Sequence, residues 1–179
     1  VAGHCHGTNG IRQAVEAGVR TVEHCSWVGE KGWGRDFDEN VANKMAANKV
    51  CVSPTINAGW KRFRSPEFVE TVRANYRRMK ALGIKLIAST DAGIPGVYHH
   101  DLPKALPQFA RFAELDPLET LKAATSDSAA AIDLGAITGQ IRQGYSADFV
   151  IYEANPLKDL SVLESPLLVV SSGYEVTPD

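Results

Sequence analysis

Two histidines and one aspartate each stand where a short hydrophobic, strand-like run ends. They are His4, His24 and Asp91, and each precedes small or polar residues and then a helix-like segment. Neutral imidazoles and carboxylates are good ligands for divalent metals such as zinc. These three side chains are therefore candidate ligands for a divalent metal, with zinc preferred, bound as one ion or as two.

The segments between these residues decide whether the three side chains can meet. Strand and helix patterns alternate along the first two-thirds of the chain, which is typical of parallel βα units. The carboxyl ends of parallel strands open into one shared crevice, so residues far apart in sequence converge there. A single histidine is more often structural, and Asp91 alone could cap a turn, but three equivalent strand ends favour the metal-ligand interpretation.

The predicted elements follow from hydrophobic periodicity and from helix start and stop signals. Strands are predicted at residues 1–5, 19–24, 50–55 and 84–89, and helices at 9–17, 37–48, 65–81, 102–115, 117–124 and 126–133. From Gly139 the pattern changes to short strands at 147–152 and 167–171, followed by a hairpin turn. We therefore expect two parts, residues 1–137 and residues 138–179.

Composition and charge narrow the class of protein. The 179 residues are 44% hydrophobic and carry a formal net charge of -2, which allows one core with a small appendage and gives no sign of a nucleic-acid surface. No apolar run is long enough to cross a bilayer, and no signal-peptide pattern opens the chain. Three cysteines, an odd number, favour reduced thiols in a cytoplasmic protein. The chain begins at Val1 inside a strand-like segment, so we expect it to be a piece of a longer protein.

Three strand-end motifs and a distinctive tail occur in order along the chain. The motifs lie at residues 1–7, 18–24 and 89–93, and the tail carries Gly139-Gln140-Ile141 and Asn155-Pro156-Leu157. Together they resemble the metal-dependent amidohydrolase superfamily, specifically its imidazolonepropionase- and prolidase-like members. The motifs are similar to that family's fifth, sixth and eighth barrel strands, and the tail looks like its return from the barrel to a small β-sandwich.

The resemblance implies an α/β fold with strands five to eight of a (β/α)₈ TIM barrel, followed by strands of a small β-sandwich. It implies that His4 and His24 bind the metal. Asp91 would be a further ligand and the general base, which takes a proton from the attacking water and passes it to the leaving nitrogen. The family's remaining ligands, a His-x-His pair and a carboxylated lysine or acidic residue, belong to strands one to four, outside this sequence.

Four further residues are candidates for binding substrate. His6 lies two residues after His4 on the same strand face. His99 and His100 follow the loop after the last barrel strand. Arg62 lies in the loop after the third strand, where a guanidinium could grip a substrate carboxylate. A solvent-exposed position without a functional role is the alternative for each of them.

The leading hypothesis is a metal-dependent hydrolase that cleaves a C–N bond of an amide, peptide-like or cyclic amide substrate through metal-activated water. We expect a small-molecule substrate, a partner in the N-terminal half of the barrel or in another chain, and a homo-oligomer, with no nucleic acid and no membrane. The alternative is a non-catalytic half-barrel fragment or subunit that needs a partner chain for the remaining ligands. A flavodoxin-like module is disfavoured, because no phosphate-binding turn follows a strand.

Overall fold

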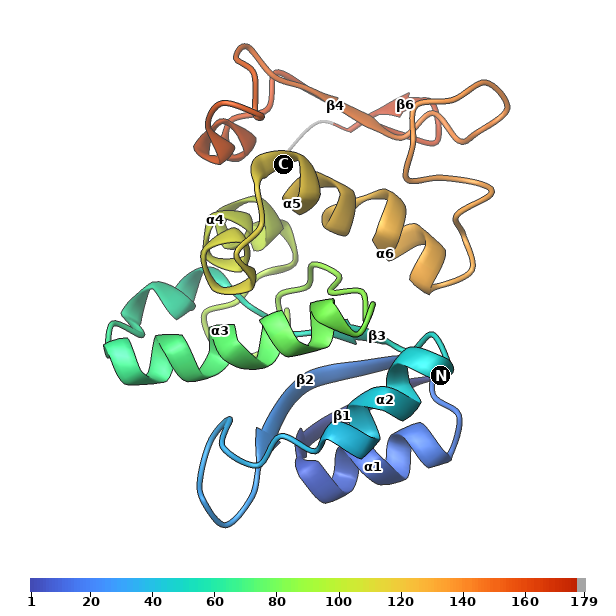
Figure 1. Ribbon diagram of the computed structural model, residues 1–179. Coiled ribbons are helices and arrows are strands. Elements are labelled where there is room, and N and C mark those ends of the chain that lie inside the picture. Colours follow the sequence, from blue (N-terminus) through green and yellow to red (C-terminus); the bar gives the residue numbers. More distant parts are fainter. Residues whose placement is uncertain (177–179) are drawn as a thin grey trace.

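A parallel three-stranded sheet forms the first part of the fold. The computed structural model describes residues 1–176, and Figure 1 shows its elements along the chain. The strands β1 (Ala2–Gly7), β2 (Thr21–Val28) and β3 (Cys51–Ser53) pair in the order β1-β2-β3, and both pairs are parallel. The α/β class predicted from the alternating pattern is confirmed.

Helices separate the strands, as βα units require. The α-helices are α1 (Thr8–Glu16), α2 (Glu39–Ala47), α3 (Pro66–Ala81), α4 (Leu102–Ala113), α5 (Pro117–Ala124) and α6 (Ser126–Ala131), and the short 3₁₀ helices are η1 (Ala58–Arg62), η2 (His99–Asp101) and η3 (Leu160–Glu164). The start of α3 follows its sequence signal, because Ser65 caps the helix and proline takes the first position. Within residues 1–176, no helix is both long enough and apolar enough to span a membrane.

The predicted strand at 84–89 is much shorter than expected. Leu86 forms a single parallel bridge with Val52 of β3, and the Val52 amide and carbonyl each make one hydrogen bond of 2.8 Å to this segment. The next free amide, that of Ala88, donates to the Ala123 carbonyl of α5 instead of to a strand. The segment keeps its buried hydrophobic residues, which explains the strand-like pattern, but it pairs with β3 over one residue only.

Strand β2 departs from a regular pleat at the point where its candidate ligand lies. Cys5 of β1 is opposite His24, and Gly7 is opposite Val28, so one residue of β1 faces three of β2. His24 has a φ of 65° and Cys25 a φ of 49°, in the left-handed region that non-glycine residues seldom adopt. Such a bulge re-aims side chains. A regular pleat would give His24 the face of Cys5, whereas the left-handed backbone turns its ring toward His4.

One hydrophobic core lies between the sheet and the helices. Its largest fully buried side chains include Trp27, Phe109, Phe112, Ile11 and Met45, which come from β2 and from α4, α1 and α2. Trp27 packs against Phe37, with ring centroids 4.5 Å apart. Because strands and helices share this core, the strand ends that carry the candidate ligands have a rigid base.

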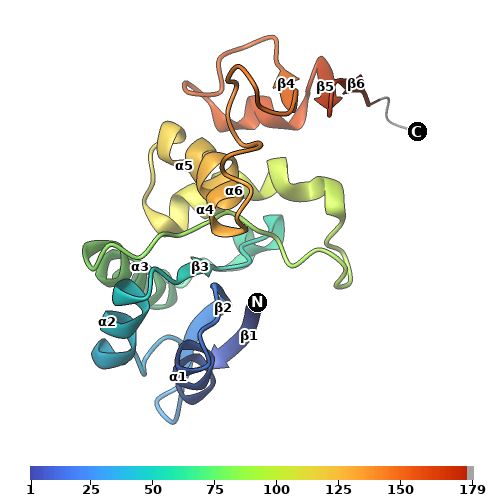
Figure 2. The ribbon, with the colours of Figure 1, turned by 90° about the vertical axis from the view of Figure 1, so that its right-hand side faces the viewer.

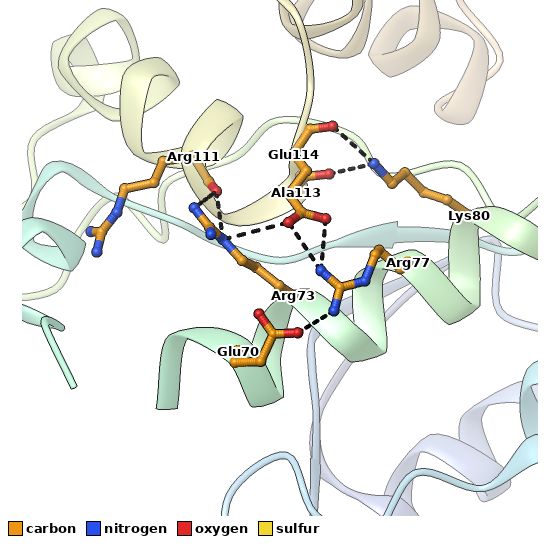
Figure 3. A network of polar contacts seen from close by, with 7 residues as sticks. All are labelled: Glu70, Arg73, Arg77, Lys80, Arg111, Ala113 and Glu114. Atoms are coloured by element: carbon orange, nitrogen blue, oxygen red, sulfur yellow. Dashed lines mark hydrogen bonds and ion pairs between the residues drawn. The ribbon is translucent and has the colours of Figure 1, made fainter. Parts of the chain in front are cut away.

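Basic side chains of α3 hold the C-terminal end of α4 (Figure 3). Arg73 donates to the carbonyl of Arg111, with an Nη2–O distance of 2.9 Å, and Lys80 donates to the carbonyl of Glu114 at 3.1 Å. Arg77 donates to both carboxylate oxygens of Glu114 at 3.0 Å. The last carbonyls of a helix lack partners inside it, and cations stabilise that end. We call this set of contacts the α3–α4 clamp. It joins two helices through basic residues of α3, although the pattern of charged residues along that helix predicts a face exposed to solvent.

A second, antiparallel sheet follows the helices. It consists of β4 (Phe149–Ile151), β5 (Leu168–Ser171) and β6 (Tyr174–Glu175) in the order β4-β5-β6, with the predicted hairpin turn between the last two. This sheet lies at the opposite end of the molecule from β1 and α1 (Figures 1 and 2). A hollow of about 960 Å³ is lined by α5, α6 and β4. The division into 1–137 and 138–179 stays a prediction, and residues 177–179 lie outside the described residues.

Candidate metal centre

Three imidazoles meet at the carboxyl end of the parallel sheet. His4 and His6 come from β1 and His24 from β2, and one potential ligand atom from each lies within 4.8 Å of the other two. The His6 and His24 rings stack at a centroid distance of 4.1 Å, and the His4 ring meets the His24 ring edge-on at 4.3 Å. The convergence of His4 and His24 expected from the sequence is present, and His6 joins them.

Each ring of this cluster has a defined polar neighbour. The Nε2 atom of His24 lies 3.0 Å from Nδ1 of His4. The Nδ1 atom of His24 lies 2.6 Å from the hydroxyl of Thr55, and Nδ1 of His6 lies 3.0 Å from the hydroxyl of Ser26. The hydroxyl contacts involve Nδ1 of His6 and of His24, so neither hydroxyl occupies the Nε2 atoms, and Nε2 of His24 faces His4. The cluster therefore brings one ring nitrogen of each histidine within 4.8 Å of the other two.

The environment keeps two of these imidazoles neutral. Burial, followed by the charges of His6 and His4, lowers the pKa of His24 to about 4, while the charge of Asp91 opposes them. Burial and His4 also lower the pKa of His6, again against the opposing charge of Asp91. A metal binds neutral imidazole rather than imidazolium. At neutral pH, His6 and His24 are thus in the protonation state that metal binding requires.

Asp91 lies beside the cluster but outside it. Its negative charge raises the pKa of both His6 and His24, which places the carboxylate within electrostatic range of the rings. Among the described residues, the group of ligand atoms within 4.8 Å of one another contains the three histidines and does not include Asp91. Asp91 has a φ of 63°, so its backbone is left-handed at the end of the segment that carries it. The predicted convergence of Asp91 with the histidines is therefore looser than that of the histidines with each other.

The remaining predicted substrate contacts lie apart from the histidine cluster. His99 and His100 are exposed in η2, and the His100 ring stacks on Tyr98 at 5.6 Å. Arg62 ends η1, where its guanidinium donates to the Gly59 carbonyl at 3.3 Å. The contacts of His100 and Arg62 are local, and a substrate role for His99, His100 and Arg62 stays a prediction.

Three further residues contact the cluster, and two of them, Thr55 and Ser26, were not predicted from the sequence. Thr55 and Ser26 hold His24 and His6, and Trp33 packs on the His6 ring at a centroid distance of 5.1 Å. A usable signal existed for Thr55, because it ends the third predicted strand just as His24 ends the second. No comparable signal existed for Ser26, since its contact depends on the bulge in β2.

A divalent metal fits the donor set of this cluster. Two nitrogens bound to one tetrahedral zinc at about 2.0–2.1 Å would lie about 3.3 Å apart, and Nε2 of His24 and Nδ1 of His4 are 3.0 Å apart. Three imidazoles suit zinc and other borderline metals better than calcium or magnesium. The hollow of about 960 Å³ lies elsewhere, beside α5, α6 and β4, and none of the three histidines lines it.

Comparison with known sequences gives consistent matches over almost the whole chain. The family model described as the amidohydrolase family matches residues 1–176. Ochratoxinase from Aspergillus niger is 29% identical over 178 residues, which cover 94% of this chain and 35% of the relative.

Comparison with solved structures also gives matches over almost the whole chain. A candidate prolidase from Bifidobacterium longum superposes with a TM-score of 0.79 at 26% identity, covering 98% of this chain and 46% of that one. A Xaa-Pro dipeptidase with methionine bound in its active site gives a TM-score of 0.75 at 26% identity, covering 99% and 45%. The chain thus spans less than half the length of the proteins that it matches.

Proposed function

Because this chain belongs to the amidohydrolase family, we propose that the protein containing it hydrolyses a C–N bond in a small-molecule amide, peptide-like or cyclic amide substrate. The observation that carries the proposal is the cluster of His4, His6 and His24 with the charge of Asp91 beside it, at the carboxyl end of a parallel sheet. Catalytic groups of barrel enzymes gather at that end.

In the proposed mechanism, His4 and His24 would hold a divalent metal, for which zinc is the preferred identity. A bound metal would supply Lewis-acid chemistry, which polarises a carbonyl and favours deprotonation of water. Asp91 acts as the general base: its carboxylate takes a proton from the attacking water and then delivers it to the leaving nitrogen. The ring of His24 is buried, whereas His4 is exposed, so water can reach the cluster from the His4 side.

His6, His99, His100 and Arg62 are proposed substrate contacts, and His6 has the position that best supports the role. It lies on the His4 face of β1, within 4.8 Å of the other ligand atoms, so it can also act as a third metal ligand. We place the chain as strands five to eight of the barrel plus part of the small β-sandwich. The N-terminal half of the protein, or another chain, would supply the remaining ligands, in keeping with the partial coverage of the relatives.

The names of the relatives support a substrate with an amide or peptide bond. One relative is an ochratoxinase and one structural neighbour is a Xaa-Pro dipeptidase. Three free thiols, at Cys5, Cys25 and Cys51, fit the cytoplasmic location that we propose. A homo-oligomeric state stays a prediction.

The test uses the full-length protein, assayed for zinc content and for release of amino acid from N-acyl amino acids and Xaa-Pro dipeptides. We expect Asp91→Asn to lower kcat by about 100- to 10,000-fold with metal content retained, and His24→Ala to lower metal content. Asp133→Asn is the matched control, because Asp133 has the same φ of 63° and is exposed at the protein surface. Wild-type activity in Asp91→Asn would contradict the proposal, and a metal-free, inactive wild type would favour the non-catalytic alternative.

A further inference from the structure

Thr55 makes two short polar contacts with a single hydroxyl group. Its Oγ1 lies 2.6 Å from Nδ1 of His24 and 2.8 Å from the carbonyl oxygen of Pro54. Both Thr55 and His24 are buried, with 7% and 8% of their surface exposed. Water therefore has little access to either contact, and the protein must satisfy these polar atoms itself.

The number of protons decides the direction of both contacts. A threonine hydroxyl has one proton to donate, and a carbonyl oxygen can only accept. The proton of Thr55 therefore goes to Pro54, whose carbonyl receives no backbone N–H among the described residues. The contact with His24 is then completed only if Nδ1 of His24 carries a proton and donates it to Thr55.

We infer that Thr55 is a positioning residue that holds His24 in the tautomer with the proton on Nδ1, so that Nε2, which faces Nδ1 of His4, keeps its lone pair unprotonated. This inference rests on the proposed function, because the role of that lone pair is to bind the metal. Metal-bound histidines generally donate their other ring N–H to a neighbouring oxygen, which fixes tautomer and ring orientation. Here a threonine hydroxyl provides that oxygen.

The backbone around Thr55 is built to keep the hydroxyl in place. Ser89 accepts a hydrogen bond from the Thr55 amide at 3.1 Å and another from the Ser53 hydroxyl at 2.6 Å. Thr55 itself has a φ of 55°, a left-handed conformation that a β-branched residue adopts only when its surroundings impose it. A run of hydrogen bonds thus leads from the 84–89 segment through Thr55 to His24 and on to His4.

The first measurement reads the tautomer directly in the metal-free, full-length protein. Long-range ¹H–¹⁵N NMR spectra of protein labelled with ¹⁵N-histidine distinguish a proton on Nδ1 from a proton on Nε2, and His24→Asn identifies the signals of His24. We expect the Nδ1–H form in the wild type and in Thr55→Ser, which keeps the hydroxyl. A proton on Nε2 in the wild type overturns the inference, whether or not any variant folds.

The second measurement is zinc affinity, obtained by competition of Zn²⁺ with a chromophoric chelator. We expect Thr55→Val to weaken zinc binding by about 10- to 100-fold, as loss of an outer hydrogen-bond partner does, and Thr55→Ser to restore it. Thr120→Val is the matched control: Thr120 is fully buried, and its hydroxyl also donates to a carbonyl, that of Asp116 at 2.8 Å, but it belongs to α5 and contacts no histidine.

The outcomes separate this inference from the proposed function. Unchanged zinc affinity in Thr55→Val, with zinc bound normally by the wild type, overturns the role of Thr55 and leaves the function standing. A wild type that binds no zinc refutes the function, while the tautomer of His24 in the NMR spectra still decides the contact with Thr55. Weaker zinc binding in Thr55→Val together with rescue by Thr55→Ser supports both.

Discussion

The depressed pKa of His24 makes a quantitative prediction about the metal-free protein. Burial, followed by the charges of His6 and His4, lowers that pKa to about 4, against about 6.5 in an unfolded chain. Below pH 6.5 the unfolded chain therefore binds a proton that the folded chain does not bind, so the free energy of unfolding falls as the pH falls toward 4. Above pH 6.5 both states are neutral at this residue, and the contribution disappears.

The size of the effect follows from the two pKa values. At about 1.36 kcal/mol per unit of pKa, the full difference of about 2.5 corresponds to about 3 kcal/mol, and the part reached at pH 5 corresponds to about 2 kcal/mol. We expect wild-type protein to lose about 2 kcal/mol more stability between pH 8 and pH 5 than His24→Asn. The difference between the two proteins removes the contribution of the carboxylates that they share.

Urea unfolding followed by tryptophan fluorescence, with a chelator present, measures this difference at each pH. His100→Asn is the control, because the His100 side chain is 76% exposed and its loss should leave the pH dependence unchanged. The reasoning is refuted if His24→Asn and the wild type lose the same stability between pH 8 and pH 5.

Three further tests concern side-chain packing and helix capping in the fold. In each of them, the midpoint of urea unfolding of the variant is measured. Gly139→Ala should destabilise more than Gly144→Ala: both glycines have a φ of 85°, but an added Cβ at Gly139 would lie 2.7 Å from the Cβ of Ala129, whereas Gly144 faces open space. The left-handed backbone alone costs about 1–2 kcal/mol, and equal losses would mean that the Ala129 contact relaxes freely. Phe112→Ala should cost about 3–5 kcal/mol, because the ring is fully buried; a loss below about 1 kcal/mol would contradict the packing. Asp116→Ala should cost about 1 kcal/mol by removing the capping box of α5, and an unchanged midpoint would show that the cap does not hold the helix.

Features that depend on neighbours in sequence were predictable. The helix at 65–81 was placed correctly because serine at the cap and proline at the first position fix a helix start through local geometry alone. The hairpin between β5 and β6 followed from its turn residues in the same way. The arrival of His4 and His24 at the same end of the sheet was predictable from the topology of parallel strands, although the contact between their rings was not.

Features that depend on distant partners were not predictable. The 84–89 segment has the composition of a strand, yet its pairing is set by the contact between Ala88 and α5. The face of His24 depends on the bulge in β2, which periodicity does not reveal. Strand alternation gave His6 the correct face, but only the measured spacing of ligand atoms shows that it lies in the cluster with His4.

The α3–α4 clamp restricts how the length of this protein can vary during evolution. Arg73, Arg77 and Lys80 reach the end of α4 because their spacing keeps them on one side of α3. One inserted or deleted residue between Arg73 and Lys80 would rotate every later side chain by about 100° around the helix axis. Length changes in α3 are therefore excluded unless the clamp is lost, whereas the turn between β2 and α2 can absorb them. Among relatives that keep the clamp, we expect gaps and insertions to fall outside this stretch of α3.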